Sequence, residues 1–114
     1  MPDPVPAPLH VLVAEDEALA AMALEDFLSR KGFRVTLAQD GQEGLERYSA
    51  DPADLVITDL RMPEESGISL IKRLREHTSR SHLPVIVMSG HAEMDDVSDM
   101  LRLQVLDLFR KPIY

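Results

Sequence analysis

The sequence predicts an α/β domain in which a five-stranded parallel sheet is covered by helices on both faces. Short apolar runs alternate with longer stretches of helix-forming residues along the whole chain. The central run, Leu55–Ile57, is rich in β-branched residues, which is typical of a strand buried on both sides. A helix-length segment between successive strands favours parallel pairing with right-handed crossovers, and therefore a doubly wound sheet.

Length and composition narrow the possible functions. With 114 residues, of which 45% are hydrophobic, the chain is expected to form one domain with a real core. No apolar run approaches the ~20 residues of a membrane helix, and a net charge of −8 argues against a nucleic-acid surface. Without cysteine there are no disulfides or thiolate metal sites. Residues 1–8 are Pro-rich and lack signal-peptide features, so we expect a flexible leader on a cytoplasmic protein.

The first predicted strand and the first predicted helix have the clearest sequence patterns. Leu9–Ala14 is an apolar run that ends abruptly in three acidic residues, and it is expected to be a strand buried on both faces. Ala18–Lys31 contains good helix formers, with Leu24 and Leu28 four residues apart on one face. Gly32 is a plausible stop for that helix.

The remaining elements follow from the same patterns. They are a strand over Phe33–Ala38, a helix over Gly41–Ala50, the central strand ending at Asp59, a helix over Ile68–His77, a strand over Pro84–Met88, a helix over Glu93–Leu103 and a strand over Leu106–Phe109. In the helix over Ile68–His77 the apolar residues Leu70, Ile71 and Leu74 should face inward, and the basic residues Lys72, Arg73 and Arg75 outward.

The predicted domain, residues 9–114, lacks the helix that normally follows the fifth strand of a doubly wound sheet. The chain ends at Tyr114, so one face of the sheet near the first strand is expected to lie open. A truncated chain, a disordered continuation or a covering partner chain would each account for this.

Polar residues follow the predicted strands at the edge where parallel α/β sheets bind ligands. Asp59 ends the central strand, Glu15 and Asp16 follow the first, Ser89 the fourth and Lys111 the fifth. Three converging acids repel one another unless a cation lies among them, and their hard oxygen atoms favour Mg²⁺. An aspartate flanked by an ammonium and a hydroxyl can attack a phosphoryl group and hold the aspartyl phosphate.

Each of these residues also has an ordinary structural interpretation. Asp59 could cap a turn and Ser89 could cap the helix after it. Glu15 could be a solvated acid before a helix, and Lys111 a surface lysine before a proline.

Together the motifs resemble the receiver domain of bacterial two-component response regulators. The resemblance rests on the acidic pair after the first strand, on Asp59-Leu60-Arg61-Met62-Pro63 with Gly67, on Met88-Ser89-Gly90 and on Lys111-Pro112, and it covers Leu9 to Pro112. It implies a flavodoxin-like, three-layer α/β/α fold. It also implies that Asp59 accepts phosphate from a sensor histidine kinase or a histidine phosphotransfer protein, in a conformational switch of a phosphorelay.

The resemblance also assigns roles to the other residues. Asp16, Asp59 and the backbone carbonyl of Arg61 would bind Mg²⁺ directly, and Glu15 through water. Ser89 would donate a hydrogen bond to the phosphoryl group, and Lys111 would pair with it. An output domain or a second copy of the chain is the implied partner, with no nucleic acid or membrane bound directly.

Several positions depart from the usual family pattern, among them Gln104-Val105, which replaces the common Gly-Ala before the fifth strand. Glu15 stands where aspartate is usual, Gly90 where alanine is frequent, and Leu108 where a tyrosine or phenylalanine normally turns inward on activation. The last of these predicts an altered output face with an intact phosphorylation site.

Two other functions are compatible with parts of the pattern. A receiver-like module that binds partners without phosphorylation is the first. The second is a Mg²⁺-dependent phosphatase of the haloacid dehalogenase type, which needs an aspartate two residues after the nucleophile, where this chain has Arg61. We therefore expect a signalling switch and not an enzyme.

Overall fold

The computed structural model describes residues 8–62, 66–77, 83–90 and 94–110 and contains the five-stranded parallel sheet predicted from the sequence. The strand order is β2-β1-β3-β4-β5, so β3 is central and β2 and β5 are the edge strands. The strands are β1 (His10–Ala14), β2 (Arg34–Ala38), β3 (Leu55–Asp59), β4 (Val85–Ser89) and β5 (Asp107–Arg110). The helices are α1 (Ala18–Arg30), α2 (Gly41–Ala50), α3 (Gly67–His77) and α4 (Met94–Arg102).

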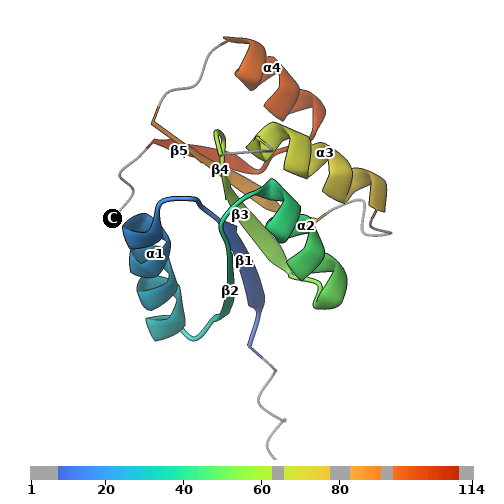
Figure 1. The fold of residues 1–114 in the computed structure, drawn as a ribbon. Coiled ribbons are helices and arrows are strands. Elements are labelled where there is room, and N and C mark those ends of the chain that lie inside the picture. The colour runs from blue at the N-terminus through green and yellow to red at the C-terminus, as the bar shows by residue number, and fades with distance from the viewer. Residues whose placement is uncertain (1–7, 63–65, 78–82, 91–93, 111–114) are drawn as a thin grey trace, which may run out of the picture.

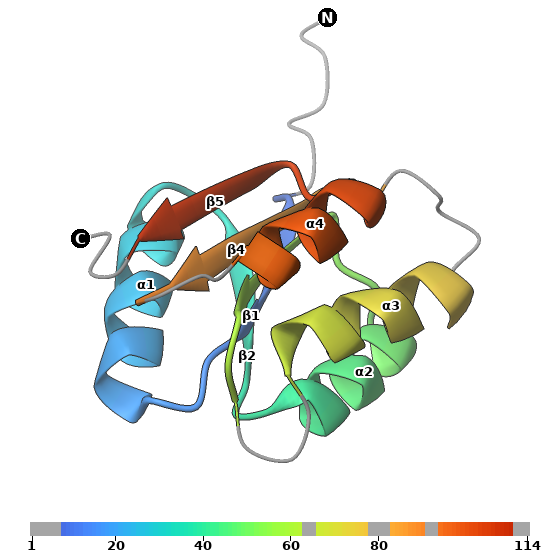
Figure 2. The same cartoon turned by 90° about the horizontal axis from the view of Figure 1, so that it is seen from above.

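The helices lie on both sides of the sheet, with α1 on one face and α2, α3 and α4 on the other (Figures 1 and 2). Every predicted element is present, and each boundary lies within one residue of its predicted position. Among the described residues, α1 is the only helix on its face. On that face Leu55 and Ile86 pack against the core while remaining partly exposed. None of the described helices is long and apolar enough to cross a membrane.

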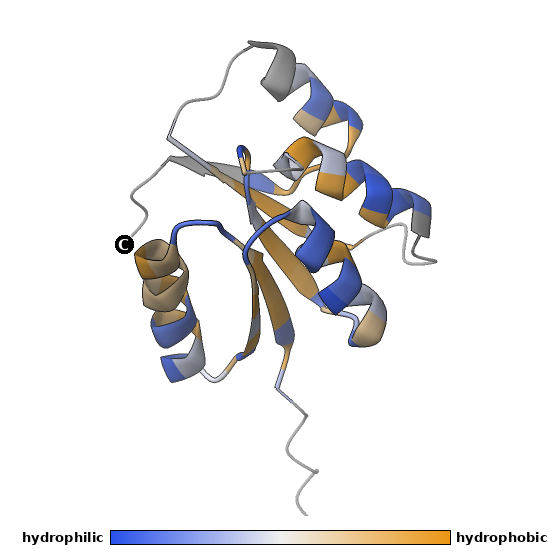
Figure 3. Ribbon diagram, viewed as in Figure 1, coloured by the Kyte–Doolittle hydropathy of each residue, from blue (hydrophilic) through white to orange (hydrophobic). Residues whose placement is uncertain are grey.

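The sheet separates two hydrophobic cores. Successive residues of β1 alternate between them, with Leu12 and Ala14 facing α2 and α3 and with Val11 and Val13 facing α1. All four are at most 1% exposed, so β1 is buried on both faces, which explains its unbroken apolar sequence. The hydropathy colours of Figure 3 show mostly apolar strands, a largely hydrophilic α2 and an α1 whose first half is apolar. Leu19 and Met22 in that half of α1 are exposed.

Local sequence signals account for the helix ends. Asp40 caps α2 by accepting a hydrogen bond from the Glu43 amide at 2.8 Å. At the end of α1, Gly32 adopts a φ of 94°, and the Phe33 amide donates to the Leu28 carbonyl at 3.1 Å. This is the glycine-ended helix stop predicted at Gly32.

One prediction for α3 is wrong. Leu70, Ile71 and Leu74 are buried as expected and Lys72 is exposed, but Arg75 is partly buried. Its guanidinium donates to three backbone carbonyls instead of facing solvent. The positively charged face of α3 is therefore not a uniformly solvated surface.

Candidate functional site

Asp59 lies at the carboxyl end of the central strand, with a strand on either side. β3 pairs with β1 through Ala14 and Thr58, and with β4 through Asp59 and Met88. The residues that immediately follow β1 therefore lie beside Asp59, and so does the end of β4. The Asp59 side chain is held in a largely buried position, because the residue is only 7% exposed.

The predicted acidic cluster forms at this edge. One carboxylate oxygen each from Glu15, Asp16 and Asp59 lies within 4.8 Å of the others. Glu15 is 1% exposed, whereas Asp16 is exposed to solvent. The cluster thus extends from the interior to the surface, and a hydrated cation has access to it from the Asp16 side.

Backbone amides fix two of these carboxylates. The Glu17 amide donates to Glu15 Oε1 at 3.0 Å, and the Arg61 amide donates to Asp59 Oδ1 at 3.3 Å. The backbone of Glu15 is itself anchored, since its amide donates to the Ala38 carbonyl of β2 at 2.9 Å. Hydrogen bonds of this kind orient the carboxylate oxygens.

The beginning of α3 packs directly on the backbone of Asp59. The Gly67 amide donates to the Leu60 carbonyl at 2.9 Å. A Cβ atom at position 67 would lie 2.0 Å from the Asp59 carbonyl oxygen, far inside van der Waals contact. The Thr58 hydroxyl also donates to that oxygen, at 3.0 Å. Gly67 and Thr58 therefore position the acidic residue without contributing a functional group.

The contribution of Thr58 was missed in the sequence analysis. A β-branched threonine in an apolar strand is typical of strand residues and gives no sign of a hydrogen bond to the following carbonyl. Gly67 entered the sequence analysis only as part of the motif after Asp59, and the structure identifies its close neighbour as the Asp59 carbonyl oxygen.

Of the other predicted site residues, Ser89 ends β4 and is 3% exposed. Because Met88 pairs with Asp59, Ser89 comes one residue after the Asp59 register on the neighbouring strand. Arg61 adjoins Asp59 through its amide, and a metal bond from its carbonyl stays a prediction. Lys111 lies outside the described residues, as does the side chain of Leu108.

The donor set fits Mg²⁺. All three side chains offer hard carboxylate oxygens, the ligands that this ion prefers. Two oxygens bound to one Mg²⁺ are at most about 4.2 Å apart, twice the metal–ligand distance. A cluster whose oxygens lie within 4.8 Å of one another can therefore hold the ion after small side-chain adjustments, or with one carboxylate acting through water.

Several proteins of known family are similar to this chain in sequence. The chain is 34% identical to response regulator RR06 of Streptococcus pneumoniae serotype 2, over 91% of this chain and 46% of that protein. It is 37% identical to transcriptional regulatory protein CseB of Streptomyces coelicolor, over 90% of this chain and 43% of that protein. The chain thus spans less than half the length of these curated relatives.

Solved structures agree on the fold. A response regulator receiver protein from Pseudomonas putida matches with a TM-score of 0.85 and 35% identity, covering 96% of this chain and 91% of that one. Chemotaxis protein CheY4 of Vibrio cholerae matches with a TM-score of 0.89 over 95% of this chain and 90% of that one; at 21% identity it supports the fold alone. The family model described as "Response regulator receiver domain" matches residues 11–114, and the chain therefore belongs to the response regulator receiver domain family.

Proposed function

We propose that the chain is a phosphorylation-controlled switch in which Asp59 accepts a phosphoryl group from a sensor histidine kinase or a histidine phosphotransfer protein. The observation that carries the proposal is the convergence of Glu15, Asp16 and Asp59 at the end of the central strand. Acids that destabilise one another in a largely buried position are a functional-site signature. Membership of the receiver family makes phosphoryl transfer the chemistry that best fits this cluster.

The reaction is a displacement at phosphorus. A carboxylate oxygen of Asp59 attacks the phosphorus of a phosphohistidine, so that a P–O bond forms as the P–N bond breaks. The imidazole nitrogen keeps the electron pair of the broken bond, and Asp59 becomes an acyl phosphate. The Arg61 amide, already hydrogen-bonded to Asp59 Oδ1, holds the carboxylate for this attack.

Asp16, Asp59 and the Arg61 carbonyl would hold Mg²⁺ directly, and Glu15 would act through water. When bound, the ion supplies the positive charge that offsets the carboxylates and the incoming phosphoryl oxygens. The amide of Glu17 keeps the Glu15 carboxylate turned toward the cluster.

Ser89 and Lys111 would respond to the phosphoryl group by donating to its oxygens. Phosphorylation adds close to two negative charges and strong acceptors, which draw nearby donors toward them. Because Ser89 ends β4, its movement biases the loop that leads to α4. The result is a population shift at the surface formed by α4 and β5, which an output domain or a second copy of the chain then binds.

The output itself differs among relatives, which include transcriptional regulatory proteins. The cyclic-nucleotide phosphodiesterase regA of Dictyostelium discoideum is 32% identical over 95% of this chain and 14% of that protein. We infer that this chain supplies the switch, as a cytoplasmic domain, and that the effector activity resides in whatever domain or protein it contacts.

Incubation with Mg²⁺ and acetyl phosphate tests the proposal. Intact-mass spectrometry is expected to show one labile phosphoryl adduct on the wild-type chain and none on Asp59→Asn. Asp26→Asn is the matched control, because Asp26 is exposed on α1 and pairs with Arg30 away from the cluster. No adduct on the wild type, or an adduct that survives in Asp59→Asn, would overturn the assignment.

Ser89→Ala tests the proposed donor. Loss of one hydrogen bond to a charged phosphoryl oxygen costs about 1.5 kcal/mol or more, so phosphorylation is expected to slow roughly tenfold. Stopped-flow measurement of adduct formation from acetyl phosphate provides the rate, and Ser89→Thr should retain most of it. An unchanged rate in Ser89→Ala would exclude a role for the hydroxyl in transfer.

A further inference from the structure

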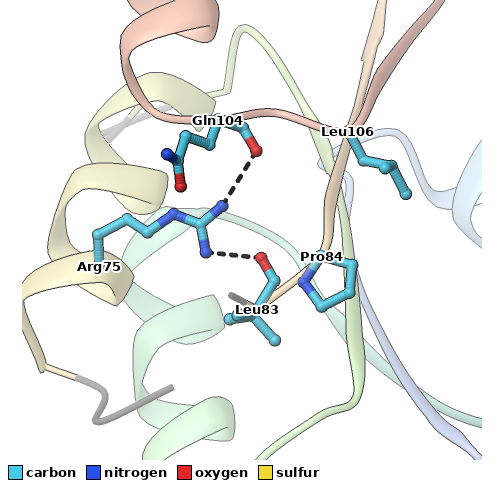
Figure 4. A pocket seen from close by; sticks show the side chains of 5 residues that line it. All are labelled: Arg75, Leu83, Pro84, Gln104 and Leu106. Carbon is cyan, nitrogen blue, oxygen red and sulfur yellow. Dashed lines mark hydrogen bonds between the residues drawn. The ribbon is translucent and has the colours of Figure 1, made fainter. Parts of the chain in front are cut away.

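A pocket opens at the opposite end of the sheet from Asp59, where α3 ends and β4 and β5 begin. Among the described residues, the pocket is lined by Arg75, Leu83, Pro84, Gln104 and Leu106 (Figure 4). Its volume is about 260 Å³, slightly below the range of clefts that hold cofactors or drug-sized ligands. A space of this size fits one or two side chains of another protein.

Arg75 forms the polar wall of this pocket. Its Nε donates to the Leu103 carbonyl at 3.1 Å, its Nη1 to the Leu83 carbonyl at 2.6 Å and its Nη2 to the Gln104 carbonyl at 3.4 Å. Figure 4 shows the guanidinium held between the last two carbonyls, with its tip toward Pro84 and Leu106. These bonds fix the side chain in place before any ligand arrives.

The charge of Arg75 is not neutralised by its carbonyl partners. Within the described part of the chain, no carboxylate lies within 4.0 Å of its guanidinium. Partial burial lowers the pKa of Arg75, because removal of the guanidinium from water disfavours its charged form. A guanidinium has five N–H donors, and three are used, so one remains on each terminal nitrogen. Each of these N–H groups can donate a charge-assisted hydrogen bond to a carboxylate oxygen.

The remaining walls are apolar. Leu83 is 1% exposed and forms the floor, whereas Leu106 is 67% exposed beside the opening. Leu106 is anchored by its amide, which donates to the Val85 carbonyl at 2.7 Å, and it immediately precedes β5, an edge strand. Arginine is enriched at protein interfaces, and here it lies beside an exposed leucine whose backbone is fixed.

We propose that this pocket binds a segment of a partner protein in which an aspartate or glutamate stands beside an aliphatic side chain. The carboxylate accepts a hydrogen bond from an N–H group that Arg75 does not use within the chain, and the aliphatic group packs on Leu83, Pro84 and Leu106. The chain itself is strongly acidic, so Arg75 gives the approaching carboxylate a local attraction that the surface as a whole does not. The proposal is independent of phosphorylation, because the pocket lies at the amino ends of β4 and β5.

The test is an NMR titration of the ¹⁵N-labelled chain with the blocked dipeptide acetyl-Leu-Glu-amide. Saturable shifts are expected at the amides of residues 83, 85 and 104–106. The neutral analogue acetyl-Leu-Gln-amide is expected to bind at least tenfold more weakly. Arg75→Gln should abolish the difference between the two peptides, whereas Arg73→Gln, on the same helix but outside the pocket, should preserve it.

Leu106→Ala provides a second variant that leaves the three hydrogen bonds of Arg75 in place. It is expected to weaken both peptides while keeping the preference for glutamate. Equal binding of the two peptides by the wild type, or equal loss of the preference for glutamate in Arg73→Gln and Arg75→Gln, would overturn the proposal.

Two other occupants would give different results. Equally tight binding of free 3-methylbutanoate would assign the pocket to a small acid. Dimerisation in sedimentation that is abolished by Leu106→Ala would assign the pocket to a second copy of the chain. Either result replaces the partner segment proposed here.

Discussion

Replacing Gly67 with alanine is expected to destabilise the domain by about 3 kcal/mol or more and to slow phosphorylation at Asp59. The new Cβ would lie 2.0 Å from the Asp59 carbonyl oxygen and 3.1 Å from Leu60 Cα. Both neighbours are backbone atoms at the end of the central strand, so relief requires α3 or β3 to move. Urea unfolding gives the loss of stability, and the rate of adduct formation reports the displacement of Asp59.

Two other glycines serve as controls for that substitution. Gly90→Ala introduces a Cβ with nothing within 4 Å, so its stability should match the wild type. In Gly44→Ala the new Cβ would lie 3.1 Å from a side-chain atom of Leu70. A gain in helix propensity of about 1 kcal/mol offsets the cost of repacking that side chain, so the net change in stability should be small. If Gly67→Ala proves as stable as Gly90→Ala, the close packing of α3 on Asp59 is not required for the stability of the domain. If stability falls while the phosphorylation rate holds, Gly67 supports the fold alone.

The order of the elements could be predicted because strands buried on both faces leave a simple trace in the sequence. β1 and β3 contain the apolar runs Val11–Ala14 and Leu55–Ile57, since each of these side chains meets a core on one face or the other. The same topology brings the ends of parallel strands to one edge. Glu15, Asp16 and Asp59 could therefore be placed together before any coordinates were known.

Arg75 could not be predicted in the same way. A basic residue on an amphipathic helix normally faces solvent, and the helical pattern alone assigns it there. What holds it inward is the set of carbonyls of Leu83, Leu103 and Gln104, which lie 8 to 29 residues further along the chain. Backbone carbonyls carry no sequence signal, so only the packing of α3 against the following loops reveals the contact.

The contacts of His10 in β1 could not be predicted from the sequence either. The sequence assigned it no role, yet it is 2% exposed. Its ring nitrogens lie 2.7 Å from Thr36 Oγ1 and 3.1 Å from the Pro52 carbonyl, partners far apart in sequence. A buried polar side chain needs such partners, and the residues that supply them become visible only once β2 and the loop before β3 are placed.

Asp59→Asn is expected to stabilise the metal-free protein by about 1 to 3 kcal/mol. Two like charges separated by 4.8 Å repel by roughly 3 kcal/mol at an effective dielectric constant of 20. Solvent beside the exposed Asp16 reduces that repulsion, whereas the burial of Asp59 adds a cost for its charge. Asparagine keeps the shape of the side chain and removes the charge. Urea unfolding in the presence of EDTA measures the gain, and Asp26→Asn should show none.

Mg²⁺ should make the wild type more stable than Asp59→Asn, the reverse of the order expected without the metal. A ligand that binds only the folded state at ten times its dissociation constant stabilises by about 1.4 kcal/mol, and larger excesses add to this. The free energy of unfolding of the wild type should therefore rise with the Mg²⁺ concentration. That of Asp59→Asn should rise little, because one of its ligand oxygens is neutral. Parallel unfolding curves for both proteins, with and without Mg²⁺, separate the two effects. An Asp59→Asn protein that is less stable than the wild type in EDTA would show that the carboxylates are compensated within the chain itself, and that cation binding is not what makes their close approach tolerable.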